Sequence, residues 1–245
     1  MPCQLAEGLL TGCVQGSVQT LLLNTREDMR MKKGIVLTPE ELYFMGVLLQ
    51  AKYIDYAYVV AMGDIQQKRG IYESESREKL AEKGILMEDF SGNLEVDEEA
   101  GKILEPVFFG NLESFVDVAL MEGEGRRIFS GRRFHFQEGR ITSTVMGKEG
   151  IFLEAVDEGW IQAWVAGLLP EDYAREQAYI PVAQIDRGNI SRIITVKSTL
   201  VGEKSAVEIY VEADGSVFAE RADGQAMVLS KEQFGLEVYR GLKGE

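Results

Sequence analysis

Two stretches decide the fold: GIFLEAVDEGWIQAWVAGLLP at residues 150–170 and GQAMVLSKEQFGLEVYRGL at residues 224–242. Each begins with a glycine and a short apolar run, then passes through Asp157 or Ser230 into apolar residues at helical spacing. Aspartate and serine are favoured at the start of a helix because their side-chain oxygens accept hydrogen bonds from free backbone amides. Each stretch therefore predicts a strand followed by an amphipathic helix.

More strands are expected on the N-terminal side of both stretches, because apolar and polar residues alternate there with a period of two. The expected strands of the first set are 115–120, 128–136, 140–146 and 151–154, and those of the second set are 190–197, 206–212, 216–220 and 226–229. Aligning Gly150 with Gly224 gives an offset of 74 residues, which places Trp160 on Phe234 and Trp164 on Val238. The sequence thus predicts an α+β protein with a pseudo-twofold body. Its two antiparallel strand-meander-plus-helix repeats are expected at 113–170 and 190–245, joined by a linker at 171–189.

A helical module is expected before these repeats, at residues 31–112. Thr38-Pro39-Glu40-Glu41 combines a capping threonine, a proline in the first turn and a glutamate three residues after the cap. A second helix, 76–83, should end at Gly84, and a third should run from Asp97 to Leu104 and be closed by Pro106. Two short strands lie between them, so the order of elements resembles a winged-helix-like module.

Residues 1–30 differ from the rest of the chain, because no turn or cap leads from them into the first helix. Met29 or Met31, followed by Lys32 and Lys33, would make an ordinary bacterial start. We therefore expect either a leader that is absent from the native product or a genuine N-terminal strand or helix.

Charge and cysteine content narrow the classes of partner. The formal net charge is −14, which disfavours nucleic acid and anionic membrane surfaces as partners. The stretch Val14 to Leu23 is interrupted by polar residues, so neither a secretory signal nor a membrane insertion is expected. The two cysteines, Cys3 and Cys13, cannot build a disulfide framework across the fold, which suits a reducing cytoplasm.

The sequence lacks the common motifs of catalysis and cofactor binding. It has no phosphate-binding loop, no dinucleotide-binding glycine pattern, no nucleophile elbow and no zinc spacing. The single histidine, His135, is expected on the solvated face of a strand, opposite Phe134 and Phe136. We therefore expect no catalytic residues, no metal site and no cofactor, although the many carboxylates leave an unrecognised carboxylate or metal site as an alternative.

Two groups of residues are candidates for binding a partner, each with a structural alternative. Arginines in and around one strand hairpin could seat an acidic segment or simply be balanced by nearby carboxylates. Aromatic residues of the two C-terminal helices could anchor an interface or fill the core. The candidates are Arg126, Arg127, Arg132 and Arg133, with Arg140 nearby, and Trp160, Trp164, Phe234 and Tyr239.

From about Leu37 to Leu242 the chain resembles the EspG-like chaperones of type VII (ESX) secretion. The resemblance is carried by LTPEEL at residues 37–42, by EKLAEKGIL and GNLEVDEEAGKILEP between residues 78 and 106, and by the two stretches quoted first. It implies a cytosolic protein that binds a helical secretion substrate, such as a WXG/LXG-type hairpin, and shields its apolar tip. It implies no catalytic residues and supplies no contact motif.

Two other functions stay open at this stage: a winged-helix-like transcription regulator and an enzyme with a carboxylate or metal site. The expected helices near residues 76–104 carry more acidic than basic side chains and so have no net positive face, which disfavours DNA binding. The sequence names neither the substrate nor the surface that binds it, and it leaves open whether the protein forms a homodimer.

Overall fold

The computed structural model describes residues 34–52, 54–62, 69–122, 125–169, 178–181, 187–200, 203–212, 216–220 and 225–244. Contacts divide the chain into two units, Met1–Gly34 and Ile35–Glu245. The predictions made for residues 1–30, including a start at Met29 or Met31, lie outside the described residues.

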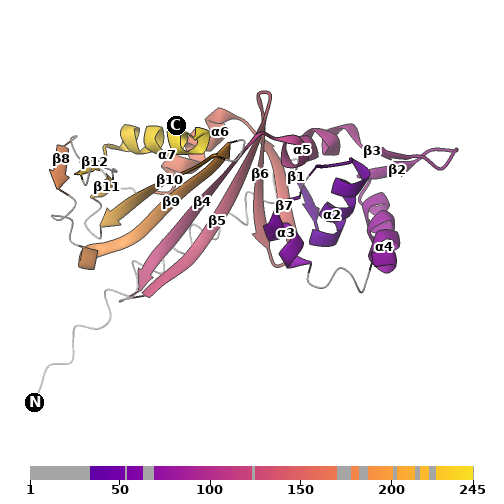
Figure 1. Ribbon diagram of the computed structural model, residues 1–245, viewed down its shortest axis with the longest axis horizontal. Coiled ribbons are helices and arrows are strands. Elements are labelled where there is room, and N and C mark those ends of the chain that lie inside the picture. Colours follow the sequence, from indigo (N-terminus) through magenta and orange to yellow (C-terminus); the bar gives the residue numbers. More distant parts are fainter. Residues whose placement is uncertain are drawn as a thin grey trace, which may run out of the picture. The chain divides into compact units, whose positions relative to one another are not determined.

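A ten-stranded sheet organises the second unit, in the order β1-β7-β6-β5-β4-β9-β10-β11-β12-β8 (Figure 1). Every neighbouring pair from β7 to β8 is antiparallel. The first five strands along the chain are β1 (Gly34–Leu37), β4 (Leu112–Glu122), β5 (Gly125–Gln137), β6 (Arg140–Gly147) and β7 (Gly150–Val156). The other five are β8 (Ala178–Pro181), β9 (Ile190–Leu200), β10 (Glu203–Glu212), β11 (Val217–Glu220) and β12 (Gln225–Val228).

The strand order runs outward from the centre of the sheet in both directions. Strands β4 and β9 lie side by side there, with Val116 opposite Val196. From them β5, β6 and β7 follow on one side and β10, β11 and β12 on the other, and each set leads into a helix. These are α6 (Glu158–Ala166) and α7 (Lys231–Lys243). The predicted α+β class with a large antiparallel sheet is confirmed.

The two helices cover one face of the sheet and enclose the first hydrophobic core. Ile161 and Val165 of α6, and Phe234 and Val238 of α7, are almost fully buried there against apolar residues of the strands. The caps form as predicted, because the Asp157 side chain accepts from the Trp160 amide and Ser230 makes a capping box with Gln233. The caps Asp157 and Ser230 lie 73 residues apart, as do the buried Ile161 and Phe234, whereas the predicted repeat uses an offset of 74.

The N-terminal module covers the opposite face of the sheet over β5, β6 and β7. Its helices are α2 (Pro39–Leu48), α3 (Tyr56–Ala61), α4 (Arg69–Glu82) and α5 (Glu98–Phe109), with a hairpin of β2 (Leu86–Glu88) and β3 (Leu94–Val96) between α4 and α5. Their apolar faces meet Ile151 and Leu153 of β7 in a second core. Thr38 forms the predicted capping box, and Gly84 has the left-handed backbone expected after a helix.

Three boundaries differ from the prediction. Helix α5 continues past Pro106, because burial of Val107 and Phe108 in the second core offsets the backbone hydrogen bond that proline cannot donate. Helix α4 begins at Arg69 rather than Ser76, and its early turn is held by Tyr72, whose ring packs edge-on against Tyr43. The predicted linker contains β8, which pairs with β12.

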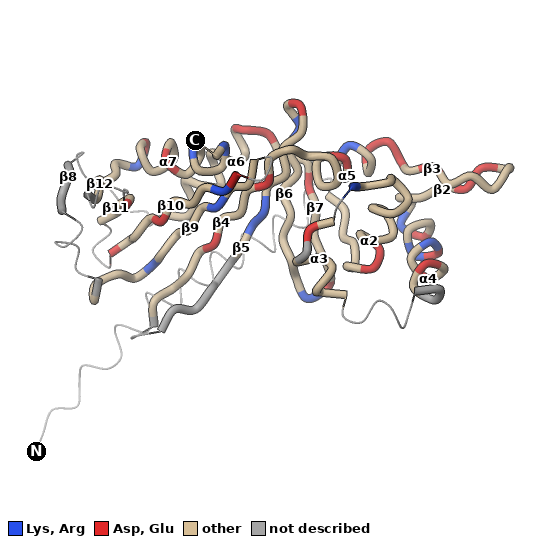
Figure 2. Tube along the Cα trace, in the orientation of Figure 1, with Lys and Arg blue, Asp and Glu red and all other residues tan. Residues whose placement is uncertain are grey.

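Charge is mixed over the described part of the chain. Figure 2 shows acidic and basic positions alternating on α4 and a basic position on β5. In α4, Lys79 pairs with Glu75, and Arg77 pairs with Glu88 of β2. None of the described helices combines the length and the apolar character needed to span a membrane.

Candidate functional site

Arg132 and Arg133 point to opposite faces of the sheet. They are neighbours in β5, and successive side chains of a strand project to opposite sides. Arg132 lies under α6, whereas Arg133 faces the N-terminal module. The predicted basic hairpin is therefore not one surface but two separate sites. Arg126 and Arg127 pair through the backbone with Met121 and Leu120, but their side chains lie outside the description.

Beneath α6, Arg132 is part of a buried ion pair. Its Nη1 atom donates to Glu154 Oε1 at 2.8 Å and to Ser143 Oγ at 2.7 Å. The Arg132 side chain is 7% exposed and that of Glu154 is 2% exposed, so both charges are almost completely removed from water. Removing one member of such a pair leaves an uncompensated charge in the interior, which is strongly destabilising.

Two tryptophans cover this ion pair. The rings of Trp160 and Trp164 are stacked, with 3° between their planes and 6.4 Å between their centroids. The Arg132 guanidinium carbon lies 4.8 Å from the centre of the Trp160 ring and 5.4 Å from that of Trp164. Cations favour the face of an aromatic ring in this range. We call Trp160, Trp164 and Arg132 the tryptophan stack; both indoles are half-buried, so part of each faces the surface.

The other two aromatic candidates have different environments. Phe234 is fully buried in the first core, as the structural alternative expected, and it offers no surface to a partner. Tyr239 is half-buried on α7, and its hydroxyl donates to Glu158 at the start of α6. Lys243 lies over the Tyr239 ring and 3.5 Å from Glu158. Among the aromatic candidates, Trp160, Trp164 and Tyr239 are thus the three whose side chains are partly exposed.

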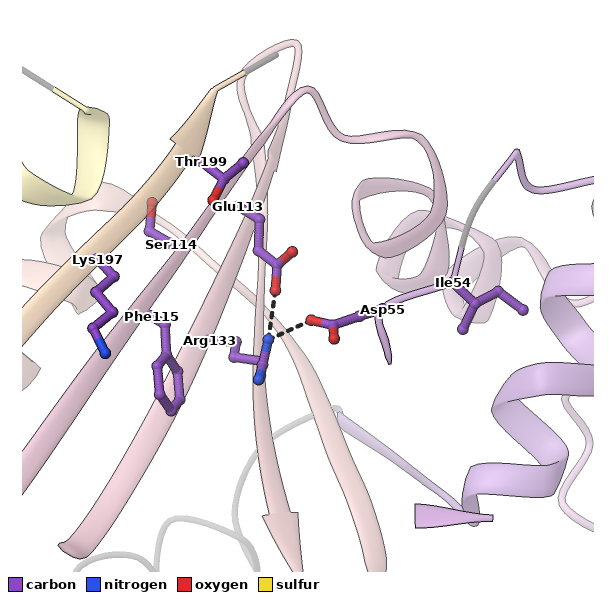
Figure 3. A pocket seen from close by; sticks show the side chains of 8 residues that line it. All are labelled: Ile54, Asp55, Glu113, Ser114, Phe115, Arg133, Lys197 and Thr199. Carbon is purple, nitrogen blue, oxygen red and sulfur yellow. Dashed lines mark hydrogen bonds and ion pairs between the residues drawn. The ribbon is translucent and has the colours of Figure 1, made fainter. Parts of the chain in front are cut away.

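On the opposite face, Arg133 lies in a pocket of about 290 Å³ between the α3 segment and the central strands. Figure 3 shows its guanidinium between Asp55, which precedes α3, and Glu113 of β4. Arg133 Nη1 donates to both carboxylates, with 2.7 Å to Glu113. The Asp55 side chain also caps α3 by accepting from the Ala57 amide. We call the site the Arg133 pocket, lined by Ile54, Asp55, Glu113, Ser114, Phe115, Arg133, Lys197 and Thr199.

The two carboxyl groups of this pocket titrate differently. Burial and a hydrogen bond with Asp55 raise the pKa of Glu113 to about 7. Burial also acts on Asp55, but hydrogen bonds from Glu113 and the Ala57 amide, together with the charge of Arg133, hold its pKa below the ordinary value. Near neutral pH, Asp55 is therefore ionised, whereas Glu113 is present in both its protonated and its ionised form.

His135 lies beside the pocket and is buried, so the predicted solvated position is wrong. It does point away from Phe134 and Phe136, as expected, but α3 covers it with Tyr58. The Tyr58 hydroxyl lies 3.3 Å from His135 Nε2 and 2.7 Å from Thr144 Oγ1. Burial lowers the pKa of His135 to about 4 and raises the pKa of Tyr58, so both are neutral near pH 7.

No sequence motif indicates the Arg133 pocket, because its residues come from separate segments. Asp55, Glu113 and Lys197 meet only when the α3 segment docks on the sheet and β4 pairs with β9. Within the described residues, no group of three or more His, Cys, Asp or Glu side chains is arranged to hold a metal ion.

Comparison with known proteins identifies a likeness of fold. No protein-family model and no curated protein sequence matches the chain. Among solved structures, the chain is similar to the Mycobacterium tuberculosis type VII secretion system chaperone EspG5, in its structure with the PE25–PPE41 dimer. The TM-score is 0.57 at 12% sequence identity, over 86% of this chain and 96% of EspG5. The remote resemblance seen in the sequence is therefore present in the fold.

Proposed function

We propose that this protein is a cytosolic chaperone or adaptor that binds a helical-hairpin substrate of a type VII (ESX-like) secretion system. The observation that carries the proposal is the fold shared with EspG5, which is a chaperone and was solved with a bound PE25–PPE41 dimer. Here the corresponding partner would be a small helical hairpin of the WXG/LXG type.

The tryptophan stack and Tyr239 are the proposed contact surface. Tryptophan, tyrosine and arginine are enriched among the few residues that supply most of the energy of a protein interface. The parallel indoles are held over Arg132, so little side-chain freedom would be lost when a partner packs on them. A helix laid across α6 could bury the exposed parts of both rings.

Two architectural features belong to the same proposal. The two strand sets with their helices would superpose as a repeat, and α4, the β2–β3 hairpin and α5 would form a winged-helix-like module used for packing. Superposition of residues 113–168 on 190–242 tests the first, and unrelated chain paths would refute it. A winged-helix regulator is a weaker alternative, because Lys102 of α5 pairs with Glu98 and Glu99 rather than facing a phosphate backbone.

The test is co-expression with each small helical-hairpin protein encoded near a type VII secretion ATPase in the source genome. We expect one of them to co-purify in a defined ratio and to bind with a Kd of about 1 μM or below by calorimetry. A protein that is folded by circular dichroism but binds none of these hairpins would contradict the proposal. Tight binding of duplex DNA that survives added salt would favour the regulator instead.

A further inference from the structure

We propose that the Arg133 pocket receives an acidic side chain from a segment of the bound partner outside the helices that pack on α6, and that Glu113 takes up a proton when this carboxylate enters. This inference rests on the proposed function for the identity of the partner. The chemistry of the pocket itself can be tested with a small carboxylate alone.

Two cations lie in one row across three strands. Phe115 of β4 is opposite Arg133 of β5 on one side and opposite Lys197 of β9 on the other. Figure 3 shows the Lys197 and Arg133 side chains on either side of the Phe115 ring, and the Arg133 guanidinium carbon is 4.7 Å from that ring. An acidic side chain lying along Phe115 would therefore have its apolar stem on an aromatic surface and a cation at each side.

The two cations differ in whether they already pair with an acidic side chain. Arg133 is held by Asp55 and Glu113, whereas Lys197 makes no ion pair with any residue in the described part of the chain. Lys197 is also exposed, so a carboxylate can reach its ammonium group. Thr199 follows Lys197 by two residues in β9, so it lies on the same face and adds a hydroxyl to the lining of the pocket. The pocket thus offers an unused positive charge and a neutral donor.

Proton uptake follows from the charges that face Glu113. The α3 segment contributes Asp55 and Tyr58, β5 contributes Arg133 and His135, and β9 contributes Lys197. Tyr58 and His135 are uncharged near pH 7. When Glu113 is protonated, the ionised groups carry a net charge of about +1; when it is ionised, they sum to about zero. An incoming carboxylate favours the protonated form, so binding and proton uptake are coupled.

The size of the pocket suits one side chain rather than a cofactor. Its volume of about 290 Å³ lies at the lower limit of small-molecule sites. It lies on the face of the sheet opposite α6 and α7, beside the α3 segment. A segment of the partner that continues from α6 to this face and crosses β4 and β9 would place an acidic residue over the row.

The experiment uses the full chain, labelled with ¹⁵N, and N-acetyl-glutamic acid amide as the probe. We expect saturable shifts at the amides of Phe115, Lys197 and Thr199, and binding roughly tenfold tighter at pH 6 than at pH 8. The glutamine analogue of the probe should produce no saturable shift. Equal shifts with both probes, or equal affinity at the two pH values, would overturn the proposal.

Two variants and one control complete the test. Lys197→Gln should weaken the probe at least tenfold, whereas Lys148→Gln, which removes an exposed lysine from the β6–β7 turn, should bind as the wild type does. Glu113→Gln mimics the protonated carboxyl, so its affinity at pH 8 should match that of the wild type at pH 6. An unchanged affinity in Lys197→Gln, or persistent pH dependence in Glu113→Gln, would refute the assignment.

The outcome separates this inference from the proposed function. If the wild-type protein binds the probe but co-purifies with no helical hairpin, the pocket chemistry stands and the chaperone role fails. If it co-purifies with a hairpin but does not bind the probe, the chaperone role stands and the pocket assignment fails.

Discussion

Each half of the sheet carries one helix on the same face, and the two helices cover very different interiors. Under α6 lie the charged Arg132 and Glu154, covered by two tryptophans. Val116 of β4 pairs with Arg132 of β5, and its neighbour Val196 of β9 pairs with Val207 of β10, so Val207 takes the place of Arg132 in the second half. Met227, which lies 73 residues after Glu154, is buried and apolar. Helix α7 approaches the strands through Gly241, where an added methyl group would come within 3.0 Å of a Val196 carbon.

This difference shows that the fold does not require the polar interior of the first half. An apolar interior supports the same strand order and helix placement in the second half. A buried ion pair gives little net stability over apolar residues of similar volume. The stability of the fold therefore does not explain why Arg132 lies beneath the two tryptophans. A preformed aromatic surface for a partner provides an explanation.

The largest expected effect comes from breaking the buried ion pair. Glu154→Met removes the carboxylate that balances the buried charge of Arg132, and we expect it to lower the free energy of unfolding by about 3–5 kcal/mol. The double variant Arg132→Met/Glu154→Met makes the first half as apolar as the second and should recover most of the loss. Urea unfolding followed by circular dichroism measures both. A double variant no more stable than the single one would show that the two halves are not interchangeable.

The aromatic residues should separate into core and contact positions. Phe234→Ala removes a fully buried ring and should cost about 3–5 kcal/mol of stability. Trp160→Ala should cost less stability, about 1–2 kcal/mol, because its ring is half-buried, but at least about 2 kcal/mol of partner affinity. Thermal melts and calorimetry with the co-purified partner give the two quantities. Loss of stability without loss of affinity in Trp160→Ala would remove the stack from the interface.

A pH dependence of stability should appear on the face opposite α6 and α7. The folded state keeps the proton on Glu113 up to about pH 7, whereas the unfolded chain releases it near the ordinary value of 4.5. The contribution of this group is therefore complete below pH 4.5 and is lost as the pH rises to 7, by about 2 kcal/mol. Urea midpoints at pH 5 and pH 7.5 measure it.

Glu113→Gln supplies the control for this dependence. The variant cannot release the proton, so the decline between pH 5 and 7.5 should shrink in comparison with the wild type. An identical slope in the two proteins would assign the dependence to another group.

The smallest effect is expected where an ion pair is exposed. Arg77 and Glu88 join α4 to the β2–β3 hairpin, with side chains 44% and 51% exposed. Water and salt screen such a pair, so Arg77→Ala should change stability by no more than about 1 kcal/mol. A loss as large as that of Glu154→Met, measured by the same urea titration, would contradict the distinction between buried and exposed pairs.

Local signals predicted the architecture well, and long-range contacts account for the errors. The caps at Thr38 and Ser230 were confirmed because capping depends on residues within one turn. The prediction that Pro106 ends a helix is wrong because it takes no account of the tertiary burial of Val107 and Phe108. Aligning Asp157 with Ser230, rather than one glycine with another, would have given the spacing of 73 from the sequence alone.

The candidate sites could be predicted only in part. Successive side chains of a strand point to opposite faces, so the sequence alone can assign Arg132 and Arg133 to different faces. The same rule assigns His135 and Phe134 to different faces, as the structure shows. No rule of spacing brings Asp55 or Lys197 to Arg133, since those contacts depend on how α3 docks and how β4 meets β9. The burial of His135 escaped prediction for the same reason, because its cover, Tyr58, lies on another element.

The two ends of the sheet are short. An open sheet exposes unpaired amides and carbonyls at its outermost strands, which can template further strands and lead to aggregation. Among the described residues the outermost strands are β1 and β8, each four residues long, and β8 ends in Pro181, which has no amide hydrogen to donate. Lengthening β8 and replacing Pro181 would add free backbone groups that favour pairing with another strand. The short edge strands therefore limit edge-to-edge pairing.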